Sequence, residues 1–427
     1  MDIKNYVNYH ILISHSPSNL NRDDMNMQKT AVFGGVKRTR ISSQSLKRAM
    51  RHSDYYKNNI GMPSDRTRQL GKLTSKYVET LKGKYDGSLV KSVISLISGE
   101  TEIKENTQSG AVAAWTVSEV EQYCLIYNEL QDKYPQQADF EREFEEGKKS
   151  LYNKLNSQNL QQKDFDKKYD EGSKKLEKDL KQKYPQHVDF DKAWDNATDK
   201  KKLLDDKTKA KLFREALQNG QDIALSGRMA TSGIMTIVDA SLAVAHAITT
   251  HTVDTDIDWF TAVDDLNQET GETGSAHLDT TEFSSGVFYR YASLNLRQLQ
   301  ENLGDVDREQ ALDIAAHVLH MLATVVPSGK QNAFAAFNLA DFALVSFSDQ
   351  PISLANAFEN PVKSRGNGFM EPSINALMEY HKTISNAYGL KGDKKALFST
   401  KECNLEAAMN VEADLSKLKE WLRKDGN

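Results

Sequence analysis

The sequence predicts an α+β fold built on an antiparallel sheet. Residues 6–13 and 284–295 alternate in the manner of strands and are rich in aromatic and β-branched residues, and the short run at 343–347 is also typical of a strand. Long helical patterns lie between and after these stretches, as at 308–325. Strands and helices do not alternate in a regular βαβ rhythm, so the sequence does not favour a parallel, doubly wound sheet.

The segment after the first strand predicts a bend, a strand and a helix. Gly34 and Gly35 mark the bend, and a short strand follows at 38–42. Ser43 is a suitable N-cap for a helix from about 44 to 56. The apolar residues of this helix fall on one side and its cations on the other, so one face can pack on a sheet while the other stays accessible.

The middle of the chain contains a charged, repetitive insertion. Residues 60–130 look mostly helical, but in 131–210 close to half of the residues are charged and the two signs nearly cancel. KYPQ followed by an Asp-Phe pair occurs at 133–140 and again at 183–190, and 162–165 is a partial third copy. Such sequence forms exposed, salt-bridged helices or a partly disordered insertion. We favour surface helices, and an extra contact to a partner or to nucleic acid stays open.

From residue 221 onward the composition is again that of a globular domain. The helix expected at 308–325 is stopped by Pro327, and a strand is expected at 343–347. A final helix is expected at 405–424.

Bulk composition limits the class of protein. The 427 residues suffice for two or three compact units, or for one fold with a large insertion. The net charge of -5 does not suggest a nucleic-acid ligand. No long apolar run or signal-peptide pattern is present, so we expect a cytoplasmic protein. Cys124 and Cys403 fit no zinc or redox spacing, and we expect no cofactor.

The charge is unevenly distributed, however. Residues 25–53 contain seven basic residues and no acidic one, with serines and a glutamine among them. Phosphate recognition uses this mixture of long cations, neutral donors and backbone N–H groups, and a helix beginning near residue 44 would add its N-terminal amides. Aromatic residues are scarce here, which favours backbone contact over base reading. The alternative is a solvated basic helix face without a ligand. The candidate contacts, with one upstream arginine, are Arg22, Lys29, Lys37, Arg38, Arg40, Ser42, Gln44, Lys47, Arg48 and Arg51.

A second candidate is the run 226–233, which has glycines near both ends. Arg228 and the neighbouring hydroxyls could hold phosphate, and Met229 could act as an apolar wedge between bases. The alternative is a plain turn with Met229 in the core. Lys330 follows a Pro-Ser-Gly turn and is a further candidate phosphate contact.

A third candidate is the adjacent aromatic pair Trp259 and Phe260, followed by Thr261, in an acid-rich stretch. These residues could stack on bases or anchor the chain to a neighbouring subunit. The alternative is that they are ordinary core aromatics.

Signals for catalysis are weak. His317 and His320 could share a metal on one helix, but no third ligand is evident. Asp23 and Asp24 beside a cation could belong, together with a histidine, to a metal-dependent ribonuclease, and this is the alternative function. A protein-only scaffold, whose basic helix binds acidic partners, is a third reading.

Seven long motifs stand out in the sequence: LISHSPS at 12–18, LNRDDMNMQK at 20–29, RISSQSLKRAMR at 40–51, IALSGRMATSG at 223–233, AHAITTH at 245–251, DIDWFTAVDDL at 256–266 and EFSSGVFYRYA at 282–292. Together they closely resemble the CasC-type backbone subunit of the type I-E CRISPR Cascade complex. The resemblance spans nearly the whole chain. The main departure is the insertion near 131–200, which looks longer than is usual for the family.

The resemblance implies a palm with an RRM-like (ferredoxin-like) antiparallel sheet, into which a helical fingers domain and a β-hairpin thumb are inserted. The implied domains are the first part of the palm at 1–60, the fingers at 61–222 with the insertion at about 131–205, the middle of the palm with the Gly-Arg-Met loop at 223–251, the thumb at 252–287, and the last part of the palm with a C-terminal helix at 288–427.

The resemblance also implies a function and roles for residues. Copies of the chain would line up head to tail along a CRISPR guide RNA, beside other Cascade subunits, and display guide bases for pairing with a target DNA strand in antiviral defence. The subunit itself would not be an enzyme. Ser42, Gln44, Lys47, Arg48 and Arg51 would grip the RNA backbone. Met229 would wedge at bases, and the residues at 259–261 would reach the adjacent subunit and fold over a flipped-out nucleotide.

Overall fold

The computed structural model describes most of the chain as two compact units. The described residues are 3–100, 103–158, 161–198, 216, 220–229, 237–262, 277–364, 366, 368–390, 393–401 and 410–427, without the side chains at 260–262 and 277–279. The first unit comprises residues 1–63, 218–227 and 238–427, and the second comprises 64–217 and 228–237. No helix in the described part of the chain is long and apolar enough to cross a membrane.

The first unit is built on one large sheet. Its strands lie in the order β12-β11-β10-β1-β9-β7-β3-β2, and β6 and β8 also pair with β9. Neighbouring strands are antiparallel, except for the parallel pair β11 and β12. The antiparallel α+β architecture is therefore as predicted. The strands are β1 (Tyr6–Ser18), β2 (Thr30–Phe33), β3 (Val36–Ile41), β6 (Leu242–Val244), β7 (Ala247–Thr249), β8 (Asp256–Ala262), β9 (His277–Asn295), β10 (Ala340–Ser348), β11 (Lys395–Ser399) and β12 (Asn410–Val411).

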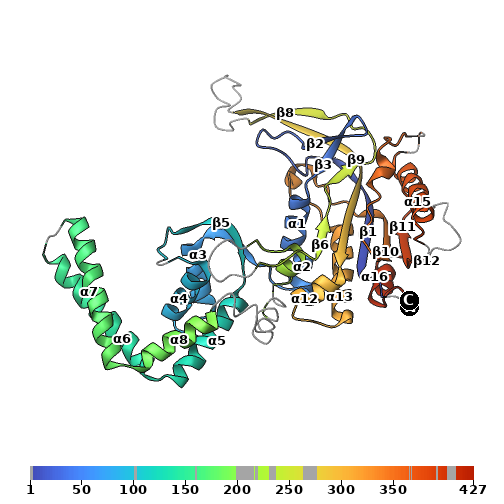
Figure 1. Ribbon diagram of the computed structural model, residues 1–427. Helices are drawn as coiled ribbons and strands as arrows, with labels where there is room; N and C mark the ends of the chain where they lie inside the picture. Colours follow the sequence, from blue (N-terminus) through green and yellow to red (C-terminus); the bar gives the residue numbers. More distant parts are fainter. Residues whose placement is uncertain are drawn as a thin grey trace, which may run out of the picture. The chain divides into compact units, whose positions relative to one another are not determined.

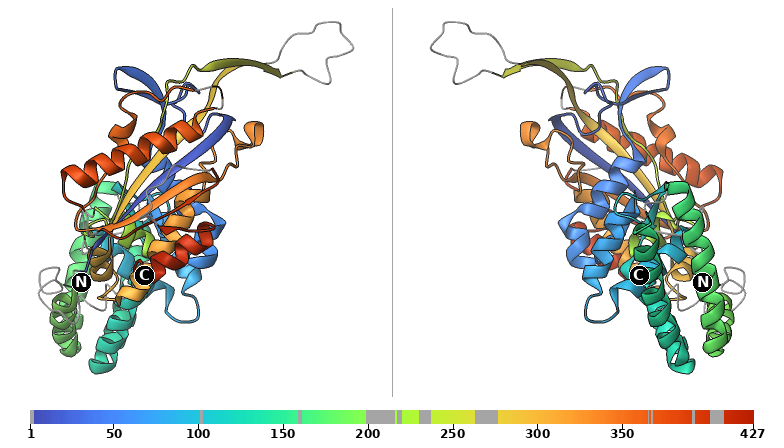
Figure 2. Two further views of the ribbon diagram at one scale, coloured as in Figure 1. Left: turned by 90° about the vertical axis from the view of Figure 1, so that its right-hand side faces the viewer. Right: turned by 90° about the vertical axis from the view of Figure 1, so that its left-hand side faces the viewer.

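The centre of this sheet is buried on both faces, because successive side chains of a strand point to opposite sides. Tyr9 and Ile11 of β1 face one core, which also contains residues of α12 (Leu296–Asn302), α13 (Arg308–Thr324) and α16 (Leu415–Arg423). Leu12 belongs to the other core, with α15 (Met370–Ala387) and the short 3₁₀ helix η3 (Ala355–Phe358). Figure 2 shows α15 lying across one side of the strands. The central strands therefore have no open face.

The helix predicted at 44–56 is two helices. α1 (Ser43–His52) begins after the N-cap Ser42, one residue earlier than predicted. Ser53 is extended, with φ -64° and ψ 149°, and its side chain caps α2 (Asp54–Asn59). The hydroxyl of Ser53 also donates to the Met50 carbonyl at 2.7 Å, which explains why one serine both ends one helix and starts the next. Two further short helices are α11 (Gln221–Ser226) and α14 (Gln331–Phe334).

The elements after residue 220 can be compared with the positions that the sequence predicted. α13 ends at Thr324, just before the predicted stop. The final helix predicted at 405–424 begins later: α16 covers only Leu415–Arg423, because Asn410 and Val411 pair with β11 as strand β12. β8 and β9 form a long hairpin that extends away from the rest of the sheet (Figure 1), with Trp259 opposite Thr280. The tip of the stretch predicted as a thumb, 263–276, lies outside the described residues.

The second unit combines helices with a two-stranded sheet. Its elements are β4 (Asp65–Gln69), α3 (Leu70–Thr80), α4 (Gly87–Ser98), β5 (Gln108–Trp115), α5 (Val117–Lys133), α6 (Gln136–Asn156), α7 (Gln162–Lys183) and α8 (Gln186–Thr198). Its core contains Leu73, Tyr77, Ile94 and Tyr123, with Trp194 of α8 packed against it. The mostly helical pattern at 60–130 is therefore confirmed, although it did not predict the strand pair β4–β5.

The charged insertion forms a helical hairpin, α6–α7, as the favoured prediction expected (Figure 1). The repeats pack against each other: the backbone N–H of Gln136 donates to the Gln186 side chain at 3.4 Å, and that of Gln186 donates to the Gln136 side chain at 3.3 Å. Two equivalent glycines, Gly147 and Gly172, each lie against a leucine of the opposite helix. The last part of the predicted insertion packs on the rest of the second unit, because Phe190 and Trp194 of α8 contact Tyr127 of α5.

Candidate nucleic-acid interface

The acid-free segment folds as the β2–β3 hairpin followed by α1, and Asn21 connects it to the preceding turn. The Asn21 side chain accepts a hydrogen bond from the Ser42 backbone N–H at 2.8 Å. The Asn21 carbonyl accepts another from the Lys29 N–H at 3.0 Å. Arg22 is exposed, and its backbone forms an isolated antiparallel β-bridge with Gln28 across the same turn. One asparagine therefore holds Arg22 and Lys29 beside the start of α1, and no sequence signal indicated this role.

The N-terminus of α1 is suited to an anion. Ser42 is the N-cap, its hydroxyl accepts a hydrogen bond from the Ser45 N–H, and the first turn contains no acidic residue. Helix N-termini carry partial positive charge and unpaired N–H groups, so an anion here is stabilised. Leu46 and Met50 are buried in the core, whereas Gln44 and Arg48 are exposed on the opposite side. The predicted two-faced helix is confirmed.

Two cationic side chains of α1 contact acceptor groups elsewhere in the first unit. Lys47 donates from Nζ to the Leu242 carbonyl at 3.0 Å. Arg51 lies 3.6 Å from the buried carboxylate of Asp222. Burial, followed by the charges of Arg51 and Arg48, lowers the pKa of His52. Arg51 and Arg48 thus add their positive charges to the effect of burial at this end of the helix.

Arg40 extends the cationic surface toward β7. Its Nε donates to the Thr30 carbonyl at 3.0 Å, and its Nη1 lies 3.0 Å from Nδ1 of His246. A guanidinium can only donate, so His246 Nδ1 is the acceptor and carries no proton. Burial, then Arg40 and Lys29, lower the pKa of His246, which favours this neutral form.

Lys330 also lies beside the turn that contains Asn21. The preceding Gly329 packs so closely that a Cβ there would be 2.6 Å from the Leu20 carbonyl oxygen. Lys330 itself adopts a left-handed conformation, with φ 50°, and starts α14. The structure therefore places Arg22, Lys29, Lys330 and the start of α1 around one short turn, although Lys330 is far from the others in the sequence.

The two neighbouring cations of β3 point to opposite sides of the strand. Lys37 is exposed and lies 3.8 Å from Glu282, a buried carboxylate that accepts the Gln28 N–H at 2.7 Å. Arg38 is fully buried, and its guanidinium donates to the carbonyls of Thr249 at 3.0 Å and Phe358 at 2.8 Å. In this structure Arg38 therefore connects parts of the fold and is not on the surface where phosphate contact was predicted.

Arg228 is likewise buried, in the second unit. Its guanidinium forms two 2.7 Å contacts with the carboxylate of Glu119. Met229 is 86% exposed, so the alternative of a core methionine does not hold. The rest of the predicted loop, from Ala230 to Gly233, lies outside the described residues.

The aromatic candidates on β8 are only partly described. Trp259 is 67% exposed, and Ile257, two residues before it on the same side of the strand, is 55% exposed. Trp259 is therefore not a core aromatic, which leaves stacking or anchoring as its predicted role. The side chains of Phe260 and Thr261 lie outside the described part of the chain.

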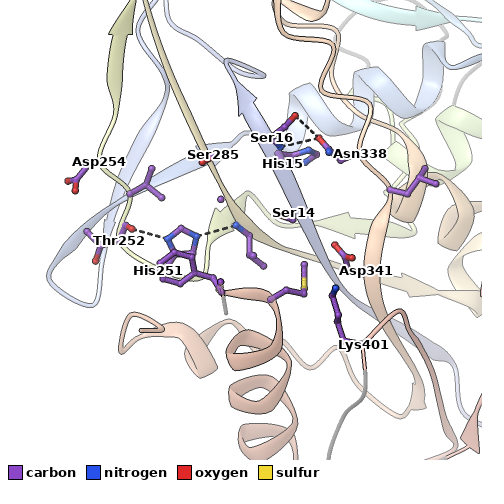
Figure 3. Close-up of a pocket in the computed structure, with 17 residues that line it drawn as sticks. Ser14, His15, Ser16, His251, Thr252, Asp254, Ser285, Asn338, Asp341 and Lys401 are labelled. Carbon is purple, nitrogen blue, oxygen red and sulfur yellow. Dashed lines mark hydrogen bonds between the residues drawn. The ribbon is translucent and has the colours of Figure 1, made fainter. Parts of the chain in front are cut away.

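A separate cavity of about 850 Å³ lies where β1, β9 and the segment after β7 meet, and sequence reasoning did not identify it. Figure 3 shows Asp254, Asp341 and Lys401 among its lining side chains, so both charge signs occur. Arg290 donates to Nε2 of His15 at 3.1 Å, and burial followed by Arg290 lowers the pKa of His15 to about 3. His15 therefore stays neutral, and this mixed lining is less suited to a phosphate chain than the α1 surface.

The residues proposed for catalysis have structural contacts. The Asp23 carboxylate accepts the backbone N–H groups of Met25 at 2.9 Å and Met27 at 3.0 Å, so it closes the turn. His320 stacks on Tyr55 with ring centroids 3.7 Å apart, and His317 hydrogen-bonds the Tyr55 hydroxyl. Within the described residues no group of three or more His, Cys, Asp or Glu is arranged to hold a metal ion.

Comparisons with known proteins agree with the motifs. A chain described as "CRISPR RNA-guided surveillance complex, pre-nicking" is 25% identical, with a TM-score of 0.69, and the match covers 99% of this chain and 100% of that one. A second, described as "CRISPR RNA-guided surveillance complex", is 21% identical with a TM-score of 0.50, covers 98% of this chain and 99% of its own, and shows a shared fold. No curated protein matches the sequence. Residues 7–424 match the CT1975-like protein family of Cas proteins, and the chain therefore belongs to that family, as its motifs predicted.

Proposed function

We propose that this protein is a non-catalytic backbone subunit of a type I-E Cascade complex that binds guide RNA without regard to its sequence. Copies of the chain would form a head-to-tail row along the RNA, together with other Cascade subunits, and leave guide bases accessible to a target DNA strand. The observation that carries the proposal is the surface around Asn21, where Arg22, Lys29, Lys330 and the N-terminus of α1 come together. We call this surface the Asn21 surface.

The chemistry of the Asn21 surface suits a phosphate chain better than a base. Its donors are cations, backbone N–H groups and an amide, and such contacts position a nucleic acid without reading its sequence. A guide of any sequence can therefore be held, while base pairing supplies specificity. An RRM stacks bases on aromatics of an open sheet face. The central strands here are buried on both faces, so the proposed RNA path follows the Asn21 surface instead.

In the proposed domain plan each unit has one role, with residues 228–237 grouped with the second unit and not with the palm. The sheet of the first unit would be the RRM-like palm, the second unit the fingers, and the β8–β9 hairpin the thumb. Exposed Trp259 and Ile257 give the hairpin an apolar side that a neighbouring copy could cover. A chain that binds its own copies head to tail through unlike surfaces forms an open row, and RNA length then limits the number of copies.

The competing function is a metal-dependent ribonuclease. The bonds from the Asp23 carboxylate to two backbone N–H groups support a structural role for it. Incubating the purified assembly with labelled guide or target RNA and Mg²⁺ separates the two readings. We expect intact RNA. Cleavage that Asp24→Ala abolishes would establish the nuclease instead.

The direct test of the proposed function is the RNA that travels with the protein. The chain would be expressed with a CRISPR array and candidate Cascade subunits, and the nucleic acid extracted from the purified assembly would be sequenced. We expect guide RNA of uniform length. Absence of RNA, with an otherwise intact assembly, would favour the protein-only scaffold.

A further inference from the structure

Hydrogen bonds hold the Arg228 guanidinium and its partner Glu119 in fixed positions. Glu119 is the third residue of α5, and it is held there by Thr116: the Glu119 N–H donates to the Thr116 hydroxyl, which in turn donates to a Glu119 carboxylate oxygen at 3.0 Å. Thr116 is the N-cap of α5, and its hydroxyl therefore holds both the helix start and the carboxylate. The guanidinium of Arg228 then meets both carboxylate oxygens at 2.7 Å and donates to the Ala114 carbonyl at 3.3 Å.

This ion pair is shielded from water. The side chains of Arg228 and Glu119 are 1% and 13% exposed, and Tyr123 packs beside them. Burial, followed by the charge of Glu119, raises the pKa of Tyr123, which indicates a poorly solvated surrounding. A two-point arginine–carboxylate contact in such a place fixes direction as well as distance.

The next residue, Met229, is in the opposite situation. Its side chain is 86% exposed, although methionine is a residue type that proteins usually bury. Gly227, on the other side of Arg228, has φ +76°, and a Cβ there would lie 2.8 Å from the Val238 carbonyl oxygen. The backbone that leads to Met229 is therefore constrained at two consecutive residues, while the methionine side chain is left in solvent.

We propose that the Glu119–Arg228 ion pair is a positioning device that holds Met229 outward as an apolar wedge between RNA bases. Arg228 acts through Met229 and does not contact phosphate. This inference rests on the proposed RNA-binding function, and it replaces the phosphate-binding role that the sequence suggested for Arg228.

The test compares the full-length chain with variants on a series of single-stranded RNAs in which 2-aminopurine is moved one position at a time. Unstacking next to the wedge raises 2-aminopurine fluorescence at periodic positions. Met229→Ala should remove this periodic signal. The double variant Glu119→Leu with Arg228→Leu replaces the buried pair by apolar side chains, which proteins often tolerate. It should weaken the signal to the Met229→Ala level. The salt dependence of RNA binding should keep its slope, whereas a lost phosphate contact would lower it by about 0.7.

Two controls separate positioning from folding. Arg308 and Asp425 form another two-point ion pair, at 2.9 and 2.7 Å, and the variant Arg308→Leu with Asp425→Asn should keep the wild-type signal. Arg228→Lys retains the charge but not the two-point contact, so it should give an intermediate signal even if the double variant does not fold. A full periodic signal in a folded Arg228 variant, or a lower salt slope, would overturn the inference. RNA that does not bind the wild-type chain at all would instead refute the proposed function.

Discussion

Removing three cations from the Asn21 surface should weaken RNA binding in a way that depends on salt. The perturbation is Arg22→Ala, Lys29→Ala and Arg48→Ala, singly and together. Arg22 and Arg48 are exposed and Lys29 is half-buried, so their loss leaves the core intact. Arg51 is a poorer choice, because its removal would leave the buried Asp222 without its cation and so reduce stability.

The magnitude follows from counterion release. Each lost contact to a single-stranded phosphate should reduce the slope of log affinity against log salt by about 0.7, and the triple variant by about 2.1. Between 50 and 200 mM salt, the wild-type protein should therefore lose about 18-fold more affinity than the triple variant. The ratio of the two affinities should be largest at the lowest salt concentration.

The assay is a fluorescence-anisotropy titration of a labelled single-stranded RNA at several salt concentrations. Lys382→Ala is the matched control, because Lys382 is an exposed cation on α15, which covers the other core of the sheet. The control should keep the wild-type slope. An unchanged slope in the triple variant, or an equal reduction in the control, would refute the assignment of RNA to the Asn21 surface.

Four further outcomes are expected. Arg38→Met should lower the free energy of unfolding by about 3 kcal/mol in denaturant titrations, because buried carbonyls lose a charged donor, yet leave the salt slope of RNA binding unchanged. Gly329→Ala should cost about 1–3 kcal/mol by the same method and weaken RNA binding, because the new Cβ would displace the chain next to Lys330. Deleting 137–186, which joins two equivalent positions of the repeat, should leave thermal unfolding cooperative and RNA affinity intact; loss of folding would contradict the repeat equivalence. Burial, then His381, lower the pKa of His10 to about 3, so stability that is complete above pH 6.5 should fall by about 2 kcal/mol at pH 5, and His10→Gln should remove this part of the pH dependence.

Much of the fold could be predicted from the sequence, because the spacing of apolar residues reflects which face of an element is buried. The strand and helix patterns at 284–295 and 308–325 correspond to β9 and α13, since a face buried along its whole length leaves a regular trace in the sequence. The break at Ser53 was missed, because a serine inside a helical pattern does not reveal that its hydroxyl will bond to the carbonyl of Met50. The strand pair β4–β5 was missed because local propensity does not show which distant segments pair.

For the candidate site, composition located the segment but not the direction of each side chain. Lys37 and Arg38 look alike in the sequence, yet only one of them reaches the surface, because neighbours on a strand point apart. Arg228 looked like a phosphate ligand because its partner, Glu119, is far away in the sequence. The meeting of Lys330 with the Asn21 turn likewise depends on tertiary packing that no local pattern encodes.

The most direct test of the account is zero-length photocrosslinking of the loaded assembly, with 4-thiouridine in the guide RNA and mass spectrometry of the crosslinked peptides. We expect crosslinks in peptides that cover 20–29 and 42–51, the two segments that Asn21 joins. Crosslinks confined to other parts of the chain, with both of these peptides recovered unmodified from fully loaded particles, would contradict the assignment of the guide RNA to the Asn21 surface.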